Sequence, residues 1–244
     1  MGKLNDKEFR CSKKSIRLGG KMSLLEIKKL SYSYPTKKHS LKNVSINIEE
    51  GTFNCIVGEN GSGKSTLIKC ILGLHKDYKG QIILNEKVGY LPQKTEIQTN
   101  FPASIEEVVI SGTITNNVNK IFYTKEDKLK AINAMKDLGI YDIRKQCFAD
   151  LSGGQQQRVL IARAICATKK IIILDEPTNG LDPKVANQIY QLLYKLKEKQ
   201  GLTIIMVSHD IDRALKYADT VIELKDGEVG YFGSSANYKS EEKK

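Results

Sequence analysis

The stretch "GENGSGKST", from Gly58 to Thr66, constrains the fold of this chain more than any other part of its sequence. It matches the pattern G-x4-G-K-[ST] of a phosphate-binding loop. It follows the strand-like run "FNCIV" and precedes a helical pattern that begins near Lys64. A strand, a glycine-rich loop and a helix in this order point backbone N–H groups at bound phosphates. The sequence therefore predicts an α/β fold that binds a nucleoside triphosphate.

Each residue type in this loop has a task in binding a triphosphate. The glycines let the backbone wrap the phosphates, Lys64 brings a positive charge to the β and γ oxygens, and the Ser65 hydroxyl can ligate Mg²⁺. The residues expected to contact the nucleotide here are Gly58, Glu59, Asn60, Gly61, Ser62, Gly63, Lys64, Ser65 and Thr66.

Strand-like and helical patterns alternate along most of the chain. Apolar runs such as "VSINI", "KIIILDE" and "TIIMVSHD" are bounded by turn residues and read as strands, and helical periods such as "VANQIYQLLYKLKEKQ" separate several of them. The continuously apolar strands favour a parallel sheet that is covered on both faces. Residues 94–167 contain no strong strand and are expected to form an inserted helical subdomain. Within it, Ser104 and Glu107 have capping-box spacing and predict a helix start, which could equally belong to a merely structural surface helix.

The two ends of the chain differ from the region between them. Residues 1–22 are polar, basic and without periodicity, and they are expected to form a disordered leader. The nucleotide-binding domain is expected to span residues 23–235, and residues 236–244 are expected to form a solvated tail.

Composition narrows the class of protein. The net charge is +11, but the lysines are spread along the chain without a stacking pattern of aromatic residues, so nucleic acid is not expected as a partner. No apolar run is long enough to span a bilayer and no secretory signal is visible, so the chain is expected in the cytoplasm, with its five scattered cysteines reduced. Cys55 and Cys166 read as core residues, and His39 and His75 as solvated loop residues.

Four polar residues follow apolar strands, where ligands bind in open α/β sheets. Asp175 is expected to hold Mg²⁺ and Glu176 to orient or deprotonate the attacking water, although two acids here could instead cap the next helix. His209 could bond a γ-phosphate oxygen, or it could be a satisfied core histidine. Gln93, in "GYLPQ", could sense Mg²⁺ or the water.

Taken together, these motifs resemble the ATP-binding subunits of ABC transporters. The resemblance covers Leu24 to about Gly233 and includes the phosphate-binding loop, Gln93, "LSGGQ" at 151–155, "ILDEP" at 173–177, "GLD" at 180–182 and His209. It implies a P-loop NTPase core, with a RecA-like parallel sheet, an antiparallel β-subdomain and an inserted helical subdomain, that hydrolyses ATP with Mg²⁺. Tyr34 matches the aromatic residue that stacks on adenine, although Tyr32 is close to it.

The stretch "LSGGQQQRVLIARAI", Leu151–Ile165, predicts a second anion-binding turn, because a Ser-Gly-Gly turn before a helix points free backbone N–H groups and the helix dipole at the same spot. The resemblance explains why the chain carries it. In the family, two subunits pack head to tail, and the signature of one subunit faces the phosphate-binding loop of the other across a shared ATP. Asp182 would lie at the seam of this homodimer. The residues implied to act in trans are Ser152, Gly153, Gly154 and Gln155.

A narrower similarity concerns "VGYLPQKTEIQTNFPASIEEVVISG", which is similar to bacterial zinc and manganese import ATPases. It implies a subunit on the cytoplasmic face of the membrane that drives a separate permease, with a substrate-binding protein as an indirect partner. Ser104–Ser111 would receive the permease, and some of Ile105, Val108, Val109 and Ile110 are expected to be exposed for it. The alternatives are an ABC ATPase for another nutrient or an exported cargo, and a soluble ABC ATPase without a transport role.

Overall fold

The computed structural model describes residues 17–18, 21–35, 37–93, 102–114 and 122–238. Most of the predicted leader, the segment just after Gln93 and residues 239–244 of the predicted tail therefore lie outside the described residues. Within the described part of the chain, no helix is both long and apolar enough to cross a membrane.

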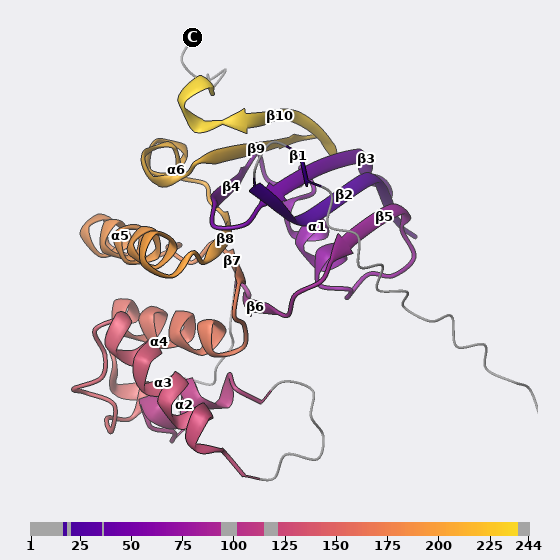
Figure 1. The fold of residues 1–244 in the computed structure, drawn as a ribbon. Coiled ribbons are helices and arrows are strands. Elements are labelled where there is room, and N and C mark those ends of the chain that lie inside the picture. The colour runs from indigo at the N-terminus through magenta and orange to yellow at the C-terminus, as the bar shows by residue number, and fades with distance from the viewer. Residues whose placement is uncertain (1–16, 19–20, 36, 94–101, 115–121, 239–244) are drawn as a thin grey trace, which may run out of the picture.

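Two sheets form the upper part of the molecule in Figure 1. The larger sheet has the strand order β10-β9-β4-β8-β7-β6, and all its pairings are parallel except β10 with β9. Its strands are β4 (Phe53–Val57), β6 (Val88–Leu91), β7 (Ile171–Asp175), β8 (Thr203–Val207), β9 (Thr220–Lys225) and β10 (Glu228–Ser234). The smaller sheet is antiparallel and consists of β1 (Arg17–Leu18), β2 (Lys21–Tyr34), β3 (Lys37–Glu49) and β5 (Lys79–Leu84). The predicted fold, a parallel core with an antiparallel β-subdomain, is confirmed.

The central strands are buried on both faces, as their continuous apolar sequences predict. In β7, Ile171 and Ile173 join the core that contains α1 (Lys64–Ile71) and the antiparallel sheet. Ile172 and Leu174 join a second core, which contains residues of α5 (Pro183–Gln200) and α6 (Ile211–Tyr217). Because successive side chains of a strand point to opposite faces, one apolar strand serves both layers.

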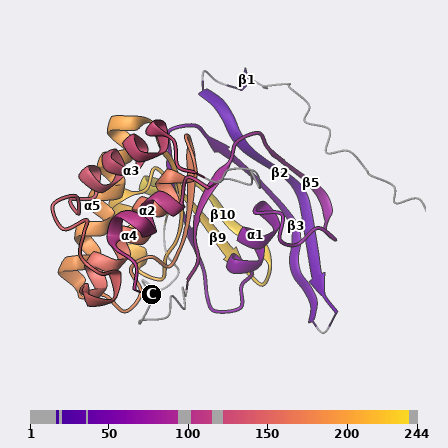
Figure 2. The ribbon, with the colours of Figure 1, turned by 90° about the horizontal axis from the view of Figure 1, so that it is seen from below.

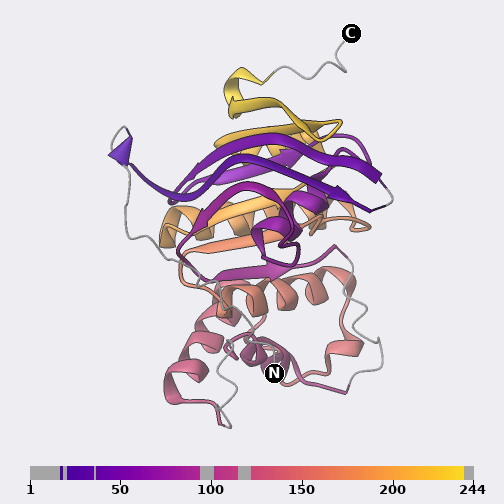
Figure 3. The ribbon, with the colours of Figure 1, turned by 90° about the vertical axis from the view of Figure 1, so that its right-hand side faces the viewer.

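Three helices form a separate layer below the sheets, seen most clearly in Figure 3. They are α2 (Ile105–Ser111), α3 (Lys125–Asp137) and α4 (Gly153–Cys166), and they pack against one another beside the edge of the parallel sheet at β6. Figure 2 shows them on the opposite side of the molecule from β2, β3 and β5. The capping box of Ser104 and Glu107 forms as predicted.

The expectation that α2 exposes apolar side chains to a partner is wrong. Ile105, Val108, Val109 and Ile110 are all buried, and each is 9% exposed or less. The reason is that α2 packs against both α3 and α4, so apolar residues on more than one of its faces are covered within the chain. The exposed apolar side chains of this layer lie instead near the connection between α2 and α3, at Ile114, Phe122, Tyr123 and Leu129.

The structure also differs from the predictions at both ends and at one histidine. Arg17–Leu18 pairs with the start of β2, so sheet structure begins before residue 23. Tyr238, expected in the solvated tail, is buried against Val57 and Val221. His75, expected to be solvated, packs on aromatic rings, while Cys55 and Cys166 are core residues as predicted.

Candidate active site

The phosphate-binding loop lies between β4 and α1, as predicted. Gly58 and Gly63 have φ angles of 139° and 108°, which L side chains rarely adopt. A Cβ atom at Gly58 would lie 2.2 Å from the Leu224 carbonyl oxygen, and one at Gly63 would lie 2.7 Å from that of Ser40. Both positions therefore require glycine, for backbone conformation and for space.

The Lys64 ammonium lies at the centre of this loop. It donates hydrogen bonds to the carbonyl oxygens of Gly58 and Glu59, both at 2.7 Å. Burial lowers the pKa of Lys64, and the carboxylates of Glu176 and Asp175 act in the opposite direction. The buried ammonium attracts anionic oxygens, whereas the two carboxylates would repel them unless a cation binds as well.

A cavity of about 200 Å³ opens along the loop. Besides residues of the loop, three predicted site residues from distant parts of the chain line this cavity, namely Tyr34, Gln93 and Glu176. Tyr32 is not among its lining residues, so the structure favours Tyr34 over Tyr32 as the aromatic residue next to the loop. The predicted loop residues that line this cavity are Asn60, Gly61, Gly63, Lys64, Ser65 and Thr66.

The Glu176 carboxylate, on the wall of this cavity, has three hydrogen-bond partners in the part of the chain that the structure describes. One carboxylate oxygen accepts from the Gln93 amide at 2.7 Å and from the Asn179 amide at 3.1 Å, and the other lies 2.5 Å from His209 Nε2. The Glu176 side chain is only 8% exposed. The structure thus brings together three predicted residues. Asn179 was missed by the sequence analysis, although its position three residues after Glu176 was a usable signal for a turn contact.

Asp175 fits the role of a cation ligand. It is 4% exposed, and its Oδ1 atom has no hydrogen-bond partner among the described residues. Burial raises the pKa of Asp175, as does the neighbouring Glu176, while Lys64, Lys69 and His209 oppose the increase. A buried carboxylate oxygen without a partner is costly unless a cation accompanies it, and together with the Ser65 hydroxyl it offers the hard oxygen ligands that Mg²⁺ prefers.

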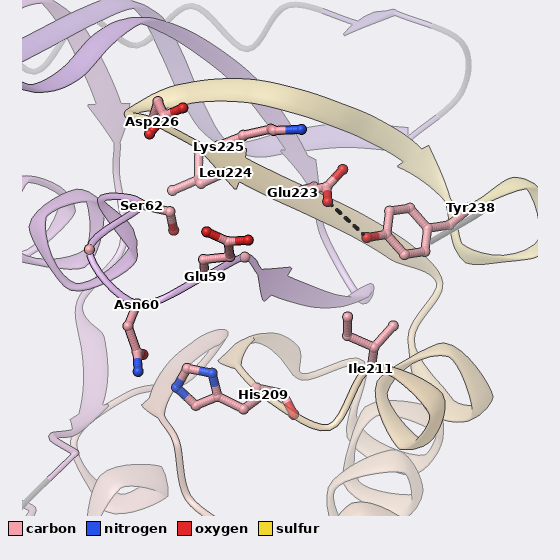
Figure 4. Close-up of a pocket in the computed structure, with 13 residues that line it drawn as sticks. Glu59, Asn60, Ser62, His209, Ile211, Glu223, Leu224, Lys225, Asp226 and Tyr238 are labelled. Carbon is pink, nitrogen blue, oxygen red and sulfur yellow. Dashed lines mark hydrogen bonds between the residues drawn. The ribbon is translucent and has the colours of Figure 1, made fainter. Parts of the chain in front are cut away.

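A second and larger cavity, of about 580 Å³, lies along another part of the same loop (Figure 4). It is lined by Gly58, Glu59 and Ser62 of the loop, by His209 and, across from them, by Glu223 and Tyr238, which are joined by a hydrogen bond of 3.2 Å. Lys64, Ser65 and Tyr34 are not among its lining residues. The smaller cavity is therefore the better candidate for the nucleotide, despite its size, because the predicted residues Lys64, Ser65 and Tyr34 line it.

The second anion-binding turn lies elsewhere, at the start of α4. Ser152 caps this helix, and its hydroxyl and the Gln155 side chain form a complete capping box. A Cβ atom at Gly154 would lie 2.5 Å from Val185 on α5, whereas one at Gly153 would meet Leu181 at an ordinary 3.5 Å. Residues 152–155 are not among the residues that line either of these two cavities. Asp182 caps α5 by accepting from the Lys184 N–H at 2.8 Å.

Comparisons with known proteins agree with this geometry. Residues 41–179 match the family model described as "ABC transporter". The chain is 37% identical over 201 residues to a Thermotoga maritima protein named "Probable metal transport system ATP-binding protein", covering 82% of this chain and 81% of the relative. It is also 37% identical to the phosphonates import ATP-binding protein PhnC of Staphylococcus aureus, covering 88% and 91%.

One solved structure bears on assembly. It is the dimeric post-hydrolysis state of the ATP-binding cassette MJ0796, bound to ADP and phosphate. The similarity has a TM-score of 0.72 and a sequence identity of 32%, and it covers 88% of this chain and all of that one.

Proposed function

Because the chain belongs to the ABC transporter family, whose cassettes bind ATP with Mg²⁺ and hydrolyse it, we propose that it powers import through a separate membrane permease. The observation that supports the chemistry best is the Glu176 carboxylate, held by three side chains on the wall of the cavity that Lys64 and Ser65 also line.

In the proposed reaction, Lys64 binds β and γ oxygens of ATP, and Asp175 and Ser65 would hold the metal ion. Mg²⁺, when bound, neutralises charge that develops on the phosphate oxygens. Glu176 orients a water molecule and accepts its proton as the water oxygen attacks the γ-phosphorus. The bond from that phosphorus to the bridging oxygen breaks, and ADP leaves with the electron pair. Gln93 and His209 keep the Glu176 carboxylate aimed at the water.

The proposed role of Glu176 is tested by Glu176→Gln. We expect ATP binding to persist while kcat falls by about 100-fold or more, because the amide cannot accept the proton. Hydrolysis is measured as phosphate release, and binding with a fluorescent ATP analogue. Glu198→Gln, an exposed acid on α5, is the matched control and should leave both unchanged. Normal turnover in Glu176→Gln would remove this residue from the mechanism.

We further propose that the active form is a homodimer with two shared ATP sites. Residues 152–155 line neither cavity beside the loop, as this arrangement predicts, because in it the turn faces the loop of the partner chain. The dimeric state of the similar cassette supports it as well. Ser152, Gly153, Gly154 and Gln155 would then contact the ATP held by the other subunit.

The permease and the cargo are the finer part of the proposal. The Thermotoga maritima relative is named as the ATP-binding protein of a metal transport system, which supports separate membrane components at the cytoplasmic face of the membrane. Phe122, 82% exposed, and the neighbouring exposed Ile114, Tyr123 and Leu129 are the best candidates to contact the permease.

We propose Zn²⁺ or Mn²⁺ as the cargo, supported by this relative and by the sequence after Gln93, and keep phosphonate as a second candidate because of the Staphylococcus aureus relative. Uptake of radiolabelled Zn²⁺, Mn²⁺ and a phosphonate is measured in cells with and without the gene. Loss of metal uptake alone would support the first cargo, loss of phosphonate uptake alone the second. Unchanged uptake of all three would exclude both.

A further inference from the structure

Three aromatic rings lie together beside the candidate nucleotide cavity. The Tyr34 hydroxyl lies 2.9 Å from Nε2 of His75. The His75 ring stacks on Tyr32 with centroids 4.6 Å apart and an interplanar angle of 13°. Tyr34 stands edge-on to both rings, at 5.1 Å from Tyr32 and 5.3 Å from His75. Of the three residues, Tyr34 is the one that lines the cavity, so His75 and Tyr32 support it from outside.

The position of His75 is set by the helix that also carries the phosphate-binding lysine. Helix α1 begins at Lys64, and its core residues Leu67 and Ile68 are fully buried. Beyond its C-terminal end, the backbone N–H groups of Leu74 and His75 both donate to the Lys69 carbonyl oxygen, at 2.9 and 3.3 Å. One rigid element therefore places Lys64 at the phosphate end of the cavity and His75 behind the Tyr34 ring.

The surroundings of His75 favour its neutral form. Burial lowers the pKa of His75, and the charge of Lys69 lowers it further. A neutral imidazole has one ring nitrogen that accepts a hydrogen bond, and in the tautomer with the proton on Nδ1 this nitrogen is Nε2, to which the Tyr34 hydroxyl can donate. The flat ring can stack on Tyr32 at the same time.

We propose that His75 is a positioning residue that fixes the plane of the Tyr34 ring as a platform for the nucleotide base. This inference rests on the proposed function and on the family resemblance, which matches Tyr34 to the aromatic residue that stacks on adenine. An aromatic platform recognises a heterocyclic base and not a phosphate, so His75 contributes to ATP affinity and has no part in the hydrolytic step.

The test compares ATP with inorganic tripolyphosphate, which has the phosphates but no base. In His75→Ala, we expect KM for ATP to rise about fivefold, the scale of one lost hydrogen bond, with kcat and inhibition by tripolyphosphate unchanged. Tyr34→Phe removes the same hydrogen bond from the other side and should raise KM equally. The double variant should be no worse than either single variant, because both delete one interaction. Leu74→Ala, at a neighbouring side chain that is 64% exposed, is the control and should match the wild type.

The outcomes separate this inference from the proposed function. If the wild type binds ATP more tightly than tripolyphosphate but His75→Ala does not change KM, only the role of His75 is overturned. The same holds if His75→Ala weakens both probes equally, which would indicate a general structural role. If the wild-type chain binds ATP no better than tripolyphosphate, Tyr34 is no base platform and the inference falls, whereas the proposed function falls only if the wild type releases no phosphate from ATP.

Discussion

At the scale of single residues, Asp175 and Glu176 are neighbours with different surroundings. Asp175 still belongs to β7 and is buried, with one oxygen unpartnered among the described residues. Glu176 leaves the strand with a φ of 51°, in the left-handed region that costs a non-glycine residue roughly 1–2 kcal/mol. Such strain is retained where the surrounding structure enforces it, as the three partners of the Glu176 carboxylate do here.

The buried charge of Asp175 leads to a prediction about stability. Because the pKa of Asp175 is raised on folding, the folded chain binds this proton more tightly than the unfolded chain, and the group destabilises the fold increasingly as pH rises above the ordinary aspartate range. Asp175→Asn should therefore raise Tm at neutral pH, by about 2–4 °C for each kcal/mol recovered in a domain of this size. It should also abolish hydrolysis, since the proposed metal ligand is lost.

Calorimetry without nucleotide or Mg²⁺ measures the Tm, and Asp142→Asn, at an exposed acid, is the control that should leave it unchanged. A lower Tm in Asp175→Asn would mean that the carboxylate stabilises the fold, contrary to the argument from burial.

At the scale of elements, the contact between α4 and α5 depends on one missing side chain. Gly154 lies in the first turn of α4, where a Cβ atom would overlap Val185 of α5. The glycines of the second anion-binding turn therefore do not all serve the same purpose, because Gly153 has room for a methyl group and Gly154 does not.

Because of this difference, substitutions at Gly153 and Gly154 can distinguish a role in helix packing from a role in phosphate binding. Gly154→Ala should destabilise the fold by about 1–3 kcal/mol through overpacking, and adding Val185→Ala should restore most of the lost stability. Gly153→Ala should be close to wild type. Urea unfolding measures the stability of the wild type, of Gly153→Ala, of Gly154→Ala and of the double variant. Equal stability of Gly153→Ala and Gly154→Ala would refute the packing role, whereas a stable double variant without ATPase activity would assign Gly154 a further role at the nucleotide.

Because α2 is buried, a charged side chain introduced into this helix should destabilise the fold. Val109 is fully buried, so Val109→Glu should unfold or strongly destabilise the chain, because a carboxylate without a partner would enter the core. Phe122→Ala, at an exposed side chain, should leave stability and ATPase activity unchanged but reduce transport in cells. Circular dichroism and uptake assays check the two results. A folded, active Val109→Glu protein would contradict the packing of α2, and normal transport by Phe122→Ala would exclude this residue from the permease contact.

At the scale of the whole molecule, the proposed homodimer would make each chain contribute two half sites. The phosphate-binding loop belongs to the sheet layers and the second anion-binding turn to the helical layer, and residues 152–155 line neither of the two cavities beside the loop. A head-to-tail pair of chains would complete both sites at once by symmetry.

Mixing two inactive variants tests this arrangement. Lys64→Ala removes the ammonium, and Gly153→Asp places a negative charge in the first turn of α4, which the helix dipole tolerates but a triphosphate does not. Alone, each variant should be inactive. Mixed equally, they should recover about a quarter of wild-type activity, because half of the dimers are mixed and each mixed dimer has one intact site. Phosphate release from the mixture measures this, with Lys64→Ala mixed with Glu176→Gln as the control. That control should stay inactive, since both changes fall on the same side of each site.

The sequence by itself determined the local chemistry of this protein. The strand, loop and helix around Lys64 and the capping boxes at Ser104 and Ser152 were predictable, because each depends on residues a few positions apart. The parallel core was predictable too, since strands buried on both faces must be apolar throughout. Weak local patterns, such as the short helix α6 and the edge strand β10, were missed.

Only the tertiary structure decided which distant residues meet. Gln93 reaches Glu176 across 83 positions of the chain, and His75 reaches Tyr34 across 41. It also decided that α2 is covered on several faces and that Tyr34 rather than Tyr32 lines the cavity. The physical reason is that these outcomes depend on how layers pack, and a local pattern of polar and apolar residues does not specify which neighbour will cover a given face.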